Sequence, residues 1–231
     1  MRRHGDRYLQ FWTDCTHVAM EPLPEGRPIP HSGDVVLPAE SGMDTDPLVP
    51  VDGPRVVGQA VYAASGWEAS HPQVMVRSQV RDRLIQGAVL LPDRFGLSIA
   101  DGWRPLELQQ ALYDDAYADP DLPPGFVSLP DPRPDHAPPH LTGGTVDCTL
   151  TYDGTPLALG TGFDAFTPDA WTDAYEPHPG RVRELRRMLY WTLVDAGFVS
   201  LPWEWWHYEY GTLRWSAVWK TSVLYGPASP D

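Results

Sequence analysis

Four side chains in this 231-residue chain have the types and the spacing to bind a metal ion and to assist hydrolysis. His140 and Asp147 lie seven residues apart, with a turn at Gly143-Gly144 between them. A turn followed by a strand can bring an imidazole and a carboxylate to one point, and both groups are good zinc donors. Glu204 and His207 lie three residues apart among indole rings, which exclude water and strengthen charge interactions.

A catalytic zinc site uses three protein ligands, keeps one position open, and needs a nearby base that is not a ligand. His140, Asp147 and His207 supply three ligands, and Glu204 supplies the base. Each segment alone permits another interpretation. The spacing of the first pair is weakly specific, and the second segment also fits an aromatic core strand with an ion-paired Glu204.

The other histidines and the cysteines have simpler interpretations. His136 forms an HxxxH pair with His140 and is an alternative ligand, although the prolines around it favour His140. His178 is expected on the surface. Cys15 and Cys148 are too few for a disulfide framework and are predicted to be free thiols. Cys148 follows Asp147 on a strand, so we expect it to face the opposite side, in the core.

Hydrophobic spacing predicts three helices. The first is indicated by apolar residues at intervals of four: Val76, Val80, Leu84 and Ala88. Pro105 is well placed for the first turn of a second helix. The third, over 181–196, is the clearest, because its apolar residues share one face and Gly197 follows as a stop.

Predicted strands alternate with these helices. Residues 145–152, which carry Asp147, alternate β-branched and polar side chains, and a hairpin signal at Asp153-Gly154 precedes a returning strand over 155–159. A buried segment over 97–100 is also predicted to be a strand. So are two aromatic-rich segments, 203–210 and 213–219. Helices and mostly antiparallel strands in this mixed order predict an α+β fold.

Charge and composition exclude several classes of protein. The chain has 31 acidic and 17 basic residues, for a formal net charge of −14, and such a surface repels nucleic-acid backbones and anionic membranes. No segment approaches the roughly 20 apolar residues of a membrane span, and the N-terminus lacks the apolar run of a signal peptide. We therefore expect a cytoplasmic protein with neither a nucleic-acid nor a membrane partner. The oligomeric state is not predicted.

Combined, the motifs become more specific. HxxGxxxD followed by ExWH resembles the zinc D,D-peptidase superfamily, whose pattern is SxHxxGxAxD…ExWH. Here His140, Gly143, Asp147 and the run 204–207 carry it. The resemblance is to the D-alanyl-D-alanine dipeptidase branch, which includes the vancomycin-resistance dipeptidase.

Other segments match the same branch. Residues 101–105 (DGWRP) are similar to its DGYRP motif, whose arginine, here Arg104, stabilises the charge that develops on the scissile carbonyl. Residues 162–166 (GFDAF) are similar to its xFDxF segment, whose aspartate, here Asp164, holds the free amino group of the dipeptide. Tyr62 faintly matches a substrate-contacting tyrosine, and Trp206 of ExWH is assigned to substrate binding by the same resemblance.

Two positions depart from the family pattern. Pro138 stands where the family has serine, which removes a hydroxyl expected near the amino end of the substrate. Thr145 stands where the family has alanine, which adds a hydroxyl close to the metal. The resemblance therefore supports the metal and the base more firmly than the exact substrate.

The resemblance implies a compact α+β fold of the D,D-peptidase and hedgehog type, with a central mostly antiparallel sheet flanked by helices. It covers roughly residues 60–210. Accordingly, 59–231 are predicted to form the catalytic domain and 1–58 an irregular Pro-rich arm, either packed on that domain or partly disordered. The implied reaction is zinc-dependent hydrolysis of a D-Ala-D-Ala dipeptide from peptidoglycan metabolism, by metal-activated water with Glu204 as general base.

Two alternatives stay open at this level. A relative recruited to another small peptide-like substrate, such as a D,D-carboxypeptidase or a tailoring hydrolase for a natural product, would carry the same motifs. The same fold also includes zinc-binding modules that serve signalling rather than catalysis. Loss of the general base would mark such a module, and Glu204 is present.

Overall fold

The structure, a computed structural model, describes residues 7–230. Within this range the main sheet has eight strands in the order β1-β8-β7-β6-β4-β3, with β10 joined to β7 and β9 joined to β10. Its strands are β1 (Thr13–Asp14), β3 (Asp52–Gly53), β4 (Val56–Gly58), β6 (Phe95–Asp101), β7 (Thr145–Tyr152), β8 (Thr155–Ala158), β9 (Val199–Leu201) and β10 (Glu204–Glu209). A smaller sheet pairs β2 (Leu48–Pro50) with β5 (Met75–Arg77).

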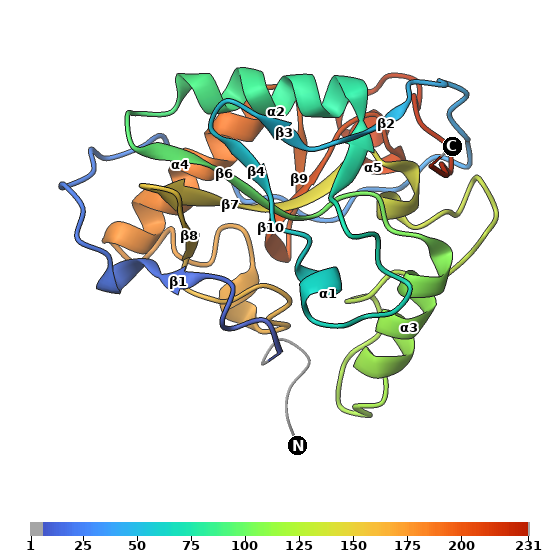
Figure 1. Cartoon of the computed structure of the whole chain (residues 1–231), viewed down its shortest axis with the longest axis horizontal. Helices are drawn as coiled ribbons and strands as arrows, with labels where there is room; N and C mark the ends of the chain where they lie inside the picture. Colours follow the sequence, from blue (N-terminus) through green and yellow to red (C-terminus); the bar gives the residue numbers. More distant parts are fainter. Residues whose placement is uncertain (1–6, 231) are drawn as a thin grey trace.

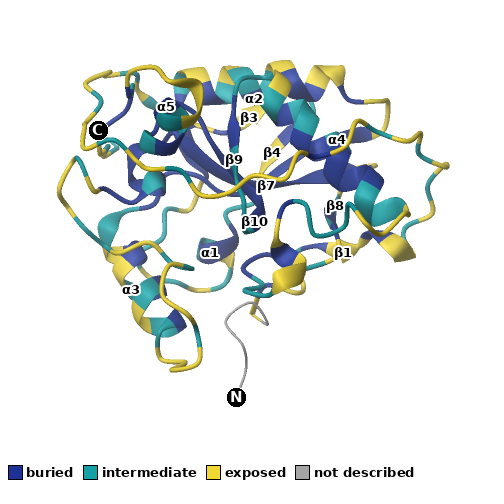
Figure 2. Cartoon of the chain, turned by 180° about the vertical axis from the view of Figure 1, so that it is seen from behind, coloured by how far each residue is buried: buried dark blue, intermediate teal, exposed yellow. Residues whose placement is uncertain are grey.

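Strand β7 is the centre of the main sheet, and all of its residues are buried. One edge of β7 pairs with β6 in antiparallel fashion. The other edge is shared, since β10 pairs with 145–147 and β8 with 151–152. Figure 2 shows these inner strands as the most deeply buried part of the molecule. Asp147 therefore lies on a fully buried strand that is paired along both edges.

The helices cover the sheet from two sides (Figure 1). They are α1 (Val61–Ala64), α2 (Ser78–Leu90), α3 (Leu106–Ala116), α4 (Arg181–Asp195) and α5 (Leu213–Trp219), with short 3₁₀ turns η2 (Cys15–His17), η3 (Pro139–Thr142) and η4 (Pro168–Ala170). In Figure 1, α2 runs along the top of the molecule with α4 beside it, and α1 and α3 lie below the sheet. The α2–α4 packing is close at Gly87, where an added Cβ would lie 3.2 Å from the Thr192 carbonyl oxygen.

Most predicted elements are present, including the 153–154 hairpin turn, and the mostly antiparallel α+β fold confirms the predicted class. Two predictions were wrong. Residues 213–219 form helix α5 rather than a strand, because the Thr212 hydroxyl caps the helix by accepting a hydrogen bond from the Trp215 amide. Val76 belongs to strand β5 rather than to the first predicted helix, which begins at Ser78.

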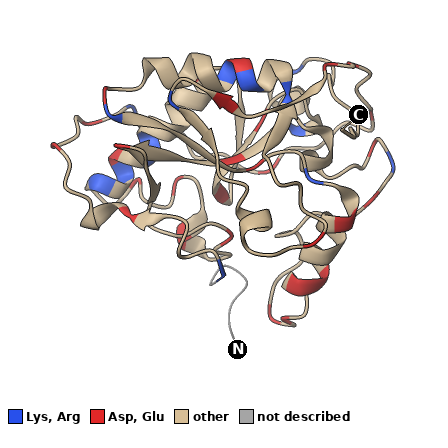
Figure 3. Ribbon diagram, in the orientation of Figure 1, with Lys and Arg blue, Asp and Glu red and all other residues tan. Residues whose placement is uncertain are grey.

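The described part of the arm packs on the domain, chiefly against α4. The Gly26 amide donates to Glu184 at 2.6 Å, and the Arg181 guanidinium donates to the Cys15 carbonyl oxygen at 2.9 Å. The Trp191 indole donates to the Arg27 carbonyl oxygen at 2.7 Å. Figure 3 shows in blue the basic residues along the ribbon of α4. The division at 58/59 stays a prediction.

No helix within residues 7–230 has both the length and the apolar character that a membrane crossing requires. Both cysteines are free and buried, and Cys148 is in the core as predicted.

Candidate active site

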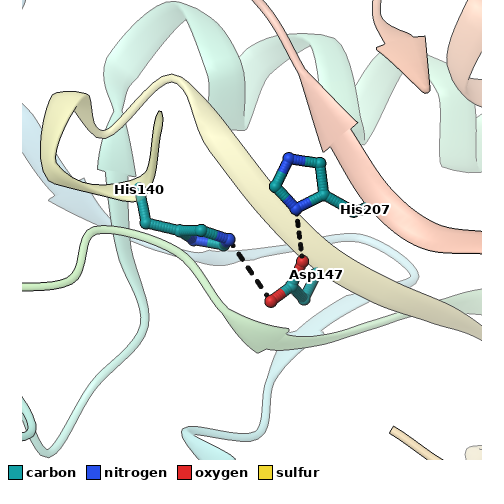
Figure 4. Close-up of side chains that lie close together, drawn as sticks. All are labelled: His140, Asp147 and His207. Carbon is teal, nitrogen blue, oxygen red and sulfur yellow. Dashed lines mark hydrogen bonds and ion pairs between the residues drawn. The ribbon is translucent and has the colours of Figure 1, made fainter. Parts of the chain in front are cut away.

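Three side chains from three separate segments meet at one point. His140 lies in η3, Asp147 in β7 and His207 in β10, and one ligand atom of each lies within 4.8 Å of the others. The β7–β10 register places His207 directly opposite Asp147, so both side chains emerge on the same face of the sheet. Figure 4 shows both imidazole rings turned toward the Asp147 carboxylate. All three residues are buried.

The glycine pair after η3 makes this convergence possible. Gly143 has φ +71°, in the left-handed region that favours glycine. An added Cβ at Gly144 would lie 2.4 Å from the Tyr210 carbonyl oxygen, so the chain passes too close to the end of β10 for any side chain there. The turn therefore places His140 next to the strand pair that carries Asp147 and His207.

Each imidazole has one nitrogen fixed by an acceptor outside the central cluster. His140 Nδ1 lies 2.8 Å from the Gly102 carbonyl oxygen, which leaves Nε2 facing Asp147 Oδ2 at 3.3 Å. His207 Nε2 lies 3.2 Å from Glu209 Oε1, and Nδ1 lies 3.1 Å from Asp147 Oδ1. Metal-binding histidines are typically oriented in this way by a second hydrogen bond.

In the cluster, Asp147 and the His207 imidazole that faces it shift each other's pKa. Burial alone would raise the pKa of Asp147, but the facing imidazoles of His140 and His207 hold it well below its ordinary value. Burial alone would lower the pKa of His207, but its hydrogen bonds to Asp147 and Glu209 raise it to about 10. The facing imidazoles therefore favour the ionised form of the Asp147 carboxyl group, which is the form that binds a metal ion.

Glu204 faces the same cavity because of an irregularity in β10. Residues three apart on a regular strand point to opposite faces, but the β9–β10 pairing shifts register between Glu204 and Tyr208. Such a bulge re-aims a side chain, and Glu204 Oε2 lies 3.6 Å from His207 Nδ1. Burial raises the pKa of Glu204 to about 8. Its carboxyl group can therefore accept and release a proton near neutral pH.

Arg104 lies near Oδ2 of Asp147, whereas His207 lies near Oδ1. Its guanidinium is paired with Asp101 at 2.8 Å, and Nη2 lies 3.5 Å from Asp147 Oδ2. The same nitrogen donates to the Tyr62 hydroxyl at 3.3 Å, and that hydroxyl donates to Asp164 Oδ2 at 2.8 Å. The sequence-predicted Arg104, Tyr62 and Asp164 therefore form one hydrogen-bonded group beside the cluster.

These residues line a single cavity of about 1050 Å³, counted with its open mouth. Trp206 is not among the residues that line it. Its ring is buried and packs against Phe163 and Trp205. A direct contact of Trp206 with substrate stays a prediction.

The remaining histidines singled out in the sequence lie elsewhere. The His136 side chain is 52% exposed and faces Asp135, so it does not compete with His140 for the cluster. His178 is exposed, as predicted.

Two charged residues of the cavity are absent from the sequence-predicted set. Glu209 is buried against His207, accepts a hydrogen bond from the Thr212 hydroxyl, and lies 3.5 Å from Arg214. Arg214 also lines the cavity. Strand periodicity carried a signal for Glu209, because residues two apart on a strand share a face. No spacing rule links Arg214 to the site.

A buried His-Asp-His cluster with an adjacent carboxyl group and an arginine, all in one cavity, is an arrangement that a metal-dependent hydrolase can use. Comparison with known proteins identifies its class. The model of the D-ala-D-ala dipeptidase family matches residues 84–217, and the chain belongs to this family. It is 28% identical over 209 residues to the D-alanyl-D-alanine dipeptidase of Synechocystis sp., a match that covers 74% of this chain and 84% of the relative. The protein is therefore a peptidase.

Proposed function

We propose that the protein hydrolyses the peptide bond of a D-Ala-D-Ala-type dipeptide, with a zinc ion held by His140, Asp147 and His207. The observation that carries this proposal is the convergence of three buried donor atoms from η3, β7 and β10 within 4.8 Å of one another. Membership of the D-ala-D-ala dipeptidase family and the name of the Synechocystis relative support the substrate class.

The donor set fits zinc. Two imidazole nitrogens and one carboxylate oxygen are typical of catalytic zinc sites, which leave a fourth position for water or substrate. The outward nitrogens of His140 and His207 already have acceptors, the Gly102 carbonyl oxygen and the Glu209 carboxylate, so the inward nitrogens are oriented toward a shared cation. When bound, zinc supplies a Lewis acid for the scissile carbonyl and lowers the pKa of water toward ~7.

Glu204 is the general base in this proposal. It is not one of the three ligand residues, yet its carboxyl oxygen lies 3.6 Å from His207 Nδ1. It takes a proton from the attacking water and returns it to the leaving amine, as a base with a pKa near neutrality can do in both directions. Burial raises the pKa of Glu204 to about 8, and the positive charge of a bound zinc ion would lower this pKa again, toward the range that a base needs at neutral pH.

Arg104 stabilises the negative charge that develops on the carbonyl oxygen. Its guanidinium is buried and held by Asp101, Gln109 and Tyr62, so it is oriented before the substrate arrives. A preorganised donor of this kind contributes about 3–4 kcal/mol to transition-state stabilisation.

Asp164 and Tyr62 bind the ammonium group of the dipeptide. Asp164 has φ +53°, a left-handed conformation that aspartate tolerates, and its carboxylate lies in the cavity lining. The Tyr62 hydroxyl donates to that carboxylate at 2.8 Å and orients it. A free amino group is therefore favoured over an acylated one, although Pro138 removes the family serine hydroxyl from this end.

The test is a comparison of variants loaded with zinc and assayed for D-Ala release from D-Ala-D-Ala. Glu204→Gln should keep one equivalent of zinc and lose activity by about 10²–10⁴-fold. His207→Ala should lose zinc and activity together, whereas the exposed control His136→Ala should keep both. Full turnover in Glu204→Gln would overturn the base assignment, and stoichiometric zinc in His207→Ala would overturn the ligand set.

Acylated substrates separate this proposal from a D,D-carboxypeptidase. The wild-type protein should release D-Ala from D-Ala-D-Ala much faster than from N-acetyl-D-Ala-D-Ala, because the acyl group removes the charge that Asp164 binds. Release of D-Ala from the acylated substrate alone would reject the role of Asp164.

A further inference from the structure

A continuous series of polar contacts links residues that line the active-site cavity. It begins at Asp164, passes through two of the proposed metal ligands, Asp147 and His207, and ends at Asp34 on the N-terminal arm. Its members, in order of contact, are Asp164, Tyr62, Arg104, Asp147, His207, Glu209, Arg214 and Asp34. Along this series, Asp147 and His207 lie between the anion Asp164 and the cation Arg214.

Arg214 is a nearly buried cation in the cavity wall. Its side chain is 9% exposed, and its guanidinium lies over the Trp203 ring at 5.3 Å from the ring centroid. Nε lies 3.5 Å from Glu209 Oε1, beyond ordinary hydrogen-bond length. A planar guanidinium offers five donors in a fork that matches a carboxylate, so this position suits recognition of an anionic group.

The hydrogen-bond partner of Arg214 is a carboxylate from the arm. Asp34 Oδ1 accepts from Arg214 Nη2 at 2.8 Å, and the Asp34 side chain is 65% exposed. Leu37, three residues later, also lines the cavity, so this part of the arm lies at the cavity wall. Because the Asp34 carboxylate is largely in solvent, water screens its attraction to Arg214. The carboxylate of a bound ligand can therefore replace that of Asp34.

We propose that Arg214 binds the C-terminal carboxylate of the substrate, and that Asp34 of the arm holds the same guanidinium while the site is free of substrate. The inference rests on the proposed function, since it takes Asp164 as the ammonium site. A zwitterionic dipeptide carries opposite charges at its two ends, and the cavity carries the complementary charges at opposite ends of the contact series. The enzyme thus selects a free dipeptide by both termini, and the arm competes with substrate.

The test compares D-Ala-D-Ala with its C-terminal amide, D-Ala-D-Ala-NH₂, which lacks only the carboxylate charge. Wild type should prefer the acid, and Arg214→Gln should lower kcat/KM for the acid about 10- to 100-fold through KM while changing that for the amide little. Arg214→Lys should retain part of the preference, because it keeps the charge without the fork. Asp34→Asn should lower KM for the acid about two- to fivefold. Arg94→Gln, which removes an arginine at the 153–154 hairpin, is the matched control.

An equal loss on acid and amide in Arg214→Gln would overturn the proposal, since it would indicate a structural role through Glu209. So would an unchanged KM in Asp34→Asn. Calorimetric binding of the acid and the amide to zinc-loaded Glu204→Gln separates this inference from the proposed function. If the acid binds more tightly than the amide, and this preference disappears when Arg214→Gln is added, the inference is supported. Absence of turnover by wild type would reject the proposed function without changing that result. Equal binding, or no binding of either, overturns it.

Discussion

Replacement of Glu209 tests whether this carboxylate orients His207, a proposed metal ligand, and thereby strengthens metal binding. Glu209 is buried, and its carboxylate oxygen lies 3.2 Å from His207 Nε2, the nitrogen that faces away from Asp147. Burial alone would raise the pKa of Glu209, but the hydrogen bond from His207 and the charge of Arg214 hold it below its ordinary value. The group is therefore an anion at neutral pH and a charged acceptor for the imidazole N–H.

The size of the effect follows from this contact. A hydrogen bond to a charged group contributes about 1.5–3 kcal/mol, and about 1.36 kcal/mol corresponds to a factor of ten. Loss of the contact should therefore weaken zinc binding about 10- to 100-fold, the range typical of outer-shell partners of metal ligands. Glu209→Gln, which still offers an amide oxygen, should fall at the lower end, and Glu209→Ala at the upper end.

The assay is a zinc competition titration against a chromophoric chelator at fixed pH and salt. Glu107→Gln on α3, an exposed position outside the cavity lining, is the matched control and should bind zinc like wild type. Thermal unfolding of the metal-free variants should be measured in parallel, since Glu209→Ala also leaves Arg214 without a buried partner. A zinc affinity of Glu209→Gln and Glu209→Ala equal to that of the control would refute the reasoning.

Three other predictions follow from the site and the arm. Chelation of the metal should abolish hydrolysis and lower Tm, because a ligand that binds only the folded state stabilises that state. One equivalent of zinc should restore both activity and Tm. Activity that survives chelation would contradict a metal-dependent enzyme. Arg104→Ala should lower kcat about 10²–10³-fold in steady-state kinetics, and an unchanged kcat would remove Arg104 from the reaction. Burial alone would raise the pKa of Glu176, but the hydrogen bonds from Arg187 hold this pKa below its ordinary value. The pair therefore stabilises the protein fully above the unfolded pKa of about 4.3. This stabilisation is lost as the pH falls through the lower pKa of the folded state. Glu176→Gln should therefore lose about 1–3 kcal/mol in urea unfolding at pH 7 and much less at pH 3, and an equal loss at both would refute the ion-pair explanation.

The fold was predictable where local pattern and tertiary packing agree. Strand 145–152 alternates its side chains, and the 181–196 helix has one apolar face and a glycine stop, so both were found near their observed limits. Residues 213–219 were misassigned because their tryptophans and valine have high strand propensity. A side-chain cap from Thr212 outweighs that weak preference.

The residues of the candidate site could be predicted from the sequence, but the ion pairs and hydrogen bonds that connect them could not. The structure brings His140, Asp147 and His207 together as the motif spacing predicts. The bulge that turns Glu204 into the cavity depends on the register between β9 and β10, which no single-strand pattern specifies. The Asp34–Arg214 contact joins residues 180 apart, and the proline-rich arm has no period from which its path can be derived.

The most direct test of the account is the position of a zinc ion in crystals of the wild-type protein, measured by anomalous diffraction at the zinc edge. We expect one strong peak bonded to His140 Nε2, an Asp147 oxygen and His207 Nδ1 at about 2.0–2.2 Å, with the Glu204 carboxyl group beside it and not bonded to it. A peak at another group of side chains, or direct ligation by Glu204, would contradict the account.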